Sequence, residues 1–191
     1  MAIRRPLPTK EKFPVSKYHG VAMSEAEYLA LPEEKPYLEY VDGVVVQKPM
    51  PDDLHGKLIW LFDHLFFVYA EAHGGNAGPE RRTHLRRTGG YRLPDTAFWV
   101  AGTPSGKNAL PTLVVEVRSE GQSLGELREK CRAFRANGVE ACWLIDPYQR
   151  WVEVFDEARD GARLSSHEPL QASALPGFSI AQTQLFAVLD R

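Results

Sequence analysis

The sequence predicts an α/β or α+β domain in which a central mixed β-sheet is flanked by helices. Three features predict this class. Residues 37–47 have the pattern of a β-hairpin, residues 53–73 carry the longest helical pattern, and a strand–helix–strand unit runs over 113–145. Two strands that are joined through a helix lie parallel in one sheet. Helices and strands that alternate in this way form a sheet with helices packed against it.

The composition indicates a single folded domain. A chain of 191 residues can bury its own core without a disulfide or a structural zinc. Residues 1–20 are rich in Pro, Lys and Arg and lack periodicity, so we expect a basic, poorly ordered arm before one domain at residues 21–191. Cys131 and Cys142 lack a metal-binding spacing, and we expect two free thiols in a reduced interior.

The sequence also limits where the protein acts and what it binds. No apolar run is long enough to span a bilayer and no secretory signal is visible, so we expect a cytoplasmic protein without a membrane partner. The formal net charge of −2 gives no general attraction to nucleic acid. Any phosphate-binding surface must therefore be local.

A short helix and a hairpin come first. Ser24, with Glu27 three residues later, forms a capping box that predicts a helix start. Asp42-Gly43 between two apolar runs is a strong signal for a two-residue hairpin turn. Strand alternation places Glu39 on an apolar face of this hairpin. A carboxylate in that position needs a partner.

The remaining elements follow from hydrophobic periodicity. Apolar side chains recur at steps of three and four in residues 53–73 and again in residues 123–137, which predicts two helices. Gly138 stands where the second helix is expected to end in left-handed backbone. A terminal helix is expected near residues 183–189. Strands are predicted at 83–86, 95–100, 113–118, 142–145 and 151–155, with a weaker one at 178–180.

Two carboxylates interrupt apolar strands. Asp95 opens the run Thr96–Val100, and Glu116 lies inside Leu113–Val117. An acid in a buried strand is costly unless it is paired or binds a metal ion. Two explanations stay open. One is an ion pair, for which Arg118 on the same face as Glu116 is the obvious partner, and the other is a divalent cation that both acids hold.

Lys130 is the third candidate residue. It lies at the edge of the apolar stripe of its helix, so it either extends along that stripe towards solvent or points towards the sheet. Because the helix of a βαβ unit packs over the sheet, we predict that its amine lies within ~3–6 Å of a Glu116 or Asp95 oxygen. Replacement of Lys130 by alanine is expected to lower turnover at least ~10²-fold with little loss of stability. Arg118 competes with Lys130 for the position beside these carboxylates, because it has the right spacing from Glu116.

These residues together resemble the Uma2 family, formerly a domain of unknown function, within the PD-(D/E)XK nuclease superfamily. The resemblance implies a restriction-endonuclease-like core with a central mixed sheet between helices. The matching segments follow the family's order between about residues 24 and 156: Leu38–Gly43, His55, Pro94-Asp95, Val114–Ser119, Lys130, Gly138-Val139 and Trp143–Pro147.

The resemblance also implies an activity and a set of site residues. It implies that Asp95 and Glu116 bind Mg²⁺ or Mn²⁺. Lys130 would be the catalytic lysine, moved onto the following helix, and Glu39 an auxiliary acid near the metal. His55 is a further auxiliary candidate, although a histidine near a helix start can also cap or pack. Such a site is expected to hydrolyse DNA phosphodiester bonds as an endonuclease.

Partner surfaces can be suggested from two further patterns. The long helix is apolar on most sides around residues 58–68, which favours a homodimer or higher homo-oligomer. A basic segment precedes Asp95 and is either a solvated hairpin or a phosphate-contacting rim, with DNA as the expected nucleic acid. Its members are Arg81, Arg82, Arg86, Arg87 and Arg92.

Three other functions stay open. A catalytically weak protein could keep the nuclease fold and only bind nucleic acid or act as a scaffold. An enzyme acting on a small phosphorylated molecule would share the metal chemistry. A serine hydrolase is the third, because residues 121–125 match G-x-S-x-G, but Ser123 lies beyond the strand end and is better placed to cap the next helix.

Overall fold

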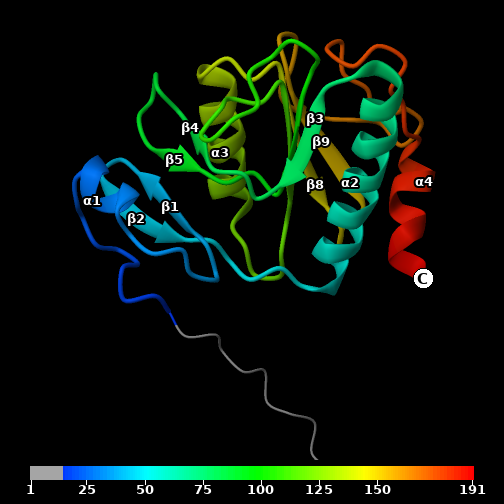
Figure 1. The fold of residues 1–191 in the computed structure, drawn as a ribbon. Helices are drawn as coiled ribbons and strands as arrows, with labels where there is room; N and C mark the ends of the chain where they lie inside the picture. Colours follow the sequence, from blue (N-terminus) through cyan, green and yellow to red (C-terminus); the bar gives the residue numbers. More distant parts are fainter. Residues whose placement is uncertain (1–14) are drawn as a thin grey trace, which may run out of the picture.

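The computed structural model describes residues 15–191 and has a six-stranded mixed sheet at its centre (Figure 1). The strand order is β10-β9-β8-β7-β6-β3. Strands β7 and β8 are parallel, as the βαβ pattern predicts, and the other neighbours are antiparallel. The strands are β3 (Asn76–Pro79), β6 (Thr96–Trp99), β7 (Leu113–Val117), β8 (Ala141–Asp146), β9 (Trp151–Phe155) and β10 (Asp160–Arg163).

Helices cover both faces of this sheet, which gives the predicted fold class (Figure 1). On one face, α2 (Asp53–His73) packs Leu58, Phe62 and Phe66 onto strands β6, β7 and β8. The C-terminal helix α4 (Gln182–Ala187) and the 3₁₀ turn η1 (Val188–Asp190) join the same core. On the other face lies α3 (Leu124–Ala136), whose apolar stripe forms a second core.

A smaller four-stranded sheet carries the N-terminal hairpin. Its order is β2-β1-β5-β4, and α1 (Glu25–Leu29) packs against it through Tyr28. The hairpin turn is the predicted one, with Asp42 and Gly43 both in left-handed backbone at φ 50° and 82°. The strands are β1 (Leu38–Val41), β2 (Val44–Gln47), β4 (Thr83–His84) and β5 (Tyr91–Arg92).

Several local predictions are confirmed and others need correction. The capping box of Ser24 and Glu27 forms, and α2 spans residues 53–73 as expected. Strands β3, β5 and β10 were not predicted, whereas the strand expected at 178–180 is reduced to an isolated bridge between Leu170 and Ile180. Cys131 and Cys142 are buried free thiols in contact with each other.

The N-terminal arm can be followed only in part. Residues 1–14 of the basic segment lie outside the described residues. Residues 15–20 are bonded to the small sheet, because the Ser16 amide donates to the Gln47 side chain and the Gly20 amide donates to the Val45 carbonyl. Among residues 15–191, every helix is too short or too polar to cross a lipid bilayer.

Candidate active site

The two strand carboxylates lie next to each other on the α3 side of the large sheet. Val115 and Val117 of β7 pack into the α2 core, so the alternate residue Glu116 points to the opposite face. Thr96 pairs with Val115 in antiparallel register, which places the preceding Asp95 beside Glu116. The Val117 amide donates to Asp95 Oδ2 at 2.8 Å and fixes that carboxylate against β7.

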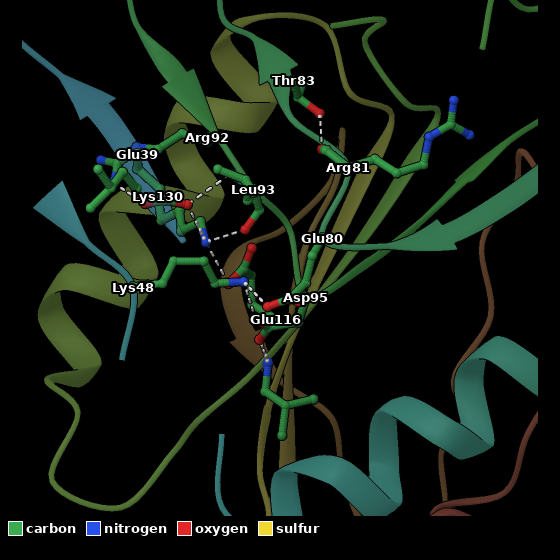
Figure 2. Close-up of polar contacts among 12 residues, drawn as sticks. Glu39, Lys48, Glu80, Arg81, Thr83, Arg92, Leu93, Asp95, Glu116 and Lys130 are labelled. Carbon is green, nitrogen blue, oxygen red and sulfur yellow. Dashed lines mark hydrogen bonds and ion pairs between the residues drawn. The ribbon is translucent and has the colours of Figure 1, made fainter. Parts of the chain in front are cut away.

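Lys130 points inward from α3 and is only 6% exposed. Its Nζ lies 3.0 Å from Glu116 Oε2 and 2.9 Å from Glu39 Oε1, and it donates to the Leu93 carbonyl at 2.9 Å (Figure 2). The amine is therefore within the predicted reach of Glu116. The alternative position at the edge of the stripe is excluded by its burial.

Glu39 reaches this cluster from the small sheet. Its neighbours Leu38 and Tyr40 belong to the core under α1, while its own side chain lies among charged groups. Glu39 Oε2 pairs with Arg92 at 2.9 Å, and Oε1 accepts the Leu93 amide at 2.8 Å as well as the Lys130 amine. The buried acid in the hairpin thus has the partners that its position requires.

Asp95 is held by two further side chains, Lys48 and His55. Lys48 follows β2, is 8% exposed and places Nζ 2.9 Å from Asp95 Oδ1. His55 Nε2 lies 3.1 Å from Asp95 Oδ2, while the His55 backbone amide donates to the α2 cap Asp52. His55 therefore lies at the cluster and also belongs to the helix start.

Sequence reasoning missed Lys48, although the hairpin register contained the signal. Glu39 pairs with Val46 across the hairpin, so these two side chains share a face of the small sheet. Lys48 is two residues beyond Val46 and continues the same face. A lysine at the end of a strand is ordinary by itself, and only this register connects it to Glu39.

Charge and burial set the protonation of the cluster. Burial raises the pKa of Glu116 to about 7, although the Lys130 ammonium opposes that shift. Burial acts in the same direction on Asp95, but Lys48 and His55 outweigh it and hold the pKa of Asp95 well below its usual range. Glu39 has its pKa lowered to about 2, because Lys130, Arg92 and Lys48 outweigh its burial. Burial alone would lower the pKa of Lys130, but the surrounding carboxylates outweigh burial and raise it.

Arg118 is not the partner of Glu116. Its guanidinium donates to Asp146 Oδ2 at 2.7 Å and to the Gln122 carbonyl at 3.2 Å. Of the two explanations left open for Glu116, the ion pair with Arg118 is therefore excluded, and Glu116 pairs with Lys130 instead. Asp146 is the last residue of β8, and the parallel register that pairs Val117 with Ile145 places it beside Arg118.

The five predicted arginines do not form one rim. Arg92 is part of the buried cluster, and Arg81 and Arg82 line a cleft of about 380 Å³ beside it, together with Glu80 and Leu93. The guanidinium of Arg81 lies over the Trp99 ring, and that of Arg82 donates to Asn108. Arg86 and Arg87 line a separate cleft with residues of the α3–β8 turn.

Ser123 caps α3, as expected for the residue before that helix. Its Oγ accepts the Glu126 amide at 3.4 Å. The G-x-S-x-G match therefore corresponds to a helix start. A nucleophilic serine would stand directly at the end of the strand, whereas Ser123 follows Val117, the last residue of β7, only after an intervening loop.

The two strand carboxylates fit a hard divalent cation. They offer oxygen donors, which Mg²⁺ prefers, and Glu116 Oε1 is buried without a hydrogen-bond partner. Among residues 15–191 no three His, Cys, Asp or Glu side chains are grouped as metal ligands. A site of two carboxylates is nevertheless typical of Mg²⁺, which keeps several of its waters.

Comparison with known proteins identifies the family. The fold is similar to the crystal structure of "a putative nuclease belonging to DUF820 from Anabaena variabilis ATCC 29413", with a TM-score of 0.76 and 22% identity over 86% of this chain and 97% of that one. Among curated proteins, no sequence is similar enough to count as a match. The Uma2 family model, described as "Putative restriction endonuclease", matches residues 25–184. The chain therefore belongs to the Uma2 family.

Proposed function

We propose that this protein is a Mg²⁺-dependent endonuclease that hydrolyses phosphodiester bonds in DNA. One observation carries the proposal: a buried lysine, Lys130, contacts Glu116 on the strand next to Asp95. The same positions are those that the family resemblance assigns to metal binding and catalysis. The family description and the nuclease fold support the reaction class.

The side chains of the cluster would have different roles in hydrolysis. Asp95 and Glu116 would hold the cation through their carboxylate oxygens. When bound, Mg²⁺ would supply an activated water and neutralise charge at the phosphorus. Lys130 is fixed in direction by Glu39, Glu116 and the Leu93 carbonyl. These three contacts use all three N–H groups of the ammonium, so Lys130 would orient a water or donate to a phosphate oxygen only after one contact is released, and Glu116 is the partner that a bound cation would draw away.

The substrate would approach along the open side of the cluster. Glu80 marks that side, because its side chain is 36% exposed and lies 3.5 Å from Lys48. The adjacent cleft carries Arg81, Arg82 and Lys107, which can contact phosphates without any base readout. We place the DNA backbone in this cleft. We also propose that the protein acts as a homodimer through the outer face of α2.

A catalytically weak protein of the same fold is the second candidate. The observation that favours it is that each buried carboxylate of the cluster is already paired with a cationic side chain. Such a cluster could serve as a structural core under a nucleic-acid-binding surface. Activity with and without a divalent cation separates the two candidates.

The proposal is tested by cleavage of supercoiled plasmid DNA with Mg²⁺ or with EDTA. Asp95→Asn and Glu116→Gln keep the size of each side chain and remove its charge, so we expect cleavage to fall to the level measured with EDTA. Asp53→Asn, at an exposed position on α2, is the matched control and should retain activity. Wild-type cleavage by either site variant would contradict the metal assignment.

A further inference from the structure

Lys48 has no part in the proposed chemistry, yet it takes the oxygen that a metal ion needs. On Asp95, Oδ2 is already bound by the Val117 amide and by His55. The other oxygen, Oδ1, is the one that Lys48 contacts at 2.9 Å. A cation shared between Asp95 Oδ1 and Glu116 therefore competes directly with the Lys48 ammonium (Figure 2).

The charge of the cluster makes this competition strong. Within residues 15–191, three buried carboxylates meet three cationic side chains by direct ion pairs: Glu39, Asp95 and Glu116 with Lys48, Lys130 and Arg92. Glu80, 36% exposed and 3.5 Å from Lys48, adds one further carboxylate. A divalent ion added to this poorly solvated cluster still leaves it with excess positive charge. Two cations at contact distance from one carboxylate repel strongly when water is excluded.

Glu80 offers Lys48 a second position. Its Oε1 lies 3.5 Å from Lys48 Nζ, on the solvent side of the cluster. Glu80 has left-handed backbone at φ 50°, which is unfavourable for a residue with a side chain. Its amide donates to the carbonyls of Pro94 and Asp95, so this backbone is fixed to the metal-binding strand. Strain held at such a place is typical of functional positions.

We propose that Lys48 is a positioning residue that holds Asp95 in the metal-free protein and moves to Glu80 when a divalent cation binds. The inference rests on the metal site of the proposed function. Removing Lys48 without adding a cation leaves Asp95 buried and poorly compensated, which is costly. The exchange of ammonium for metal keeps Asp95 paired in both states. Glu80 keeps the displaced ammonium paired as well.

Calorimetric titration with Mg²⁺ alone tests the exchange, with no substrate present. If Lys48 occupies Asp95 at least nine-tenths of the time, its removal raises the apparent affinity by ~10-fold or more. We therefore expect tighter binding by Lys48→Met. Glu80→Gln should bind Mg²⁺ less tightly than wild type, because the displaced lysine loses its acceptor. Lys57→Met, which changes a lysine paired on the surface of α2, should match wild type.

Thermal unfolding gives a second readout. Without metal, Lys48→Met should melt below wild type, and saturating Mg²⁺ should raise its melting temperature by more than it raises that of wild type. Lys48→Arg keeps the charge and controls for folding; it should not gain affinity. Equal Mg²⁺ affinity in Lys48→Met and wild type would overturn the exchange while leaving the metal site intact. Failure of every variant and of wild type to bind Mg²⁺ would overturn the metal site itself.

Discussion

Lys130 is paired too closely to behave as a surface lysine. The amine contacts Glu116 and Glu39 at about hydrogen-bond distance and is shielded from solvent. The little loss of stability expected from the sequence therefore has to be revised. Removing one member of a buried ion pair costs about 3–5 kcal/mol. This is a large part of the roughly 5–15 kcal/mol that stabilises a typical domain.

We predict that Lys130→Ala lowers turnover at least ~10²-fold and also lowers the free energy of unfolding. Arg118→Ala should retain most turnover, because Arg118 pairs with Asp146 outside the carboxylate cluster. Single-turnover cleavage, corrected for the folded fraction seen by circular dichroism, measures both. A larger loss of turnover in Arg118→Ala than in Lys130→Ala would return Arg118 to the catalytic role.

Site residues could be predicted from the sequence where they break a pattern. Asp95 and Glu116 interrupt apolar strands, and Glu39 interrupts an apolar hairpin face. Lys48 and Glu80 break no pattern, because a lysine at a strand end and a glutamate in a turn are ordinary. Their roles arise only when the small sheet is placed against the large one.

Helix α2 shows the same limit at the scale of an element. The bounds of α2 follow from periodicity. Periodicity does not show which of its apolar side chains are buried in the core and which are exposed on the outer face. Phe62 and Phe66 are fully buried in the core, whereas Trp60 and Phe67 are 63% and 61% exposed. Strand β3, with the sequence Asn-Ala-Gly-Pro, has little strand propensity and forms through its pairing with β6.

We predict that Phe67→Glu converts the proposed homodimer into a monomer, because the exposed Phe67 lies seven residues, about two helical turns, from the exposed Trp60 on the outer face of α2. Light scattering across a concentration series measures the change. Phe62→Ala is the matched core variant and should instead lower the free energy of unfolding by about 3–5 kcal/mol. A wild-type protein that stays monomeric at the highest concentration would contradict the interface.

At the scale of the whole molecule, the charged cluster connects the small sheet to the large one. Lys48 and Glu39 come from the small sheet, and their partners Asp95 and Lys130 come from the large sheet and α3. These ion pairs therefore connect two separate apolar cores. Loss of their charge should weaken the attachment of the small sheet as well as the candidate site.

This arrangement predicts an acid dependence of stability. The pKa of Glu39 in the folded protein is about 2, below its ordinary value of 4.5. Ionised Glu39 therefore stabilises the fold fully above about pH 4.5, and this contribution is lost as the pH falls towards 2. Glu39→Gln should be less stable than wild type at pH 7, and the difference should shrink between about pH 4.5 and 2. Urea unfolding of both proteins across this range measures it, and a difference that stays constant down to pH 2.5 would show that the Glu39 carboxylate does not hold the two sheets together by its charge.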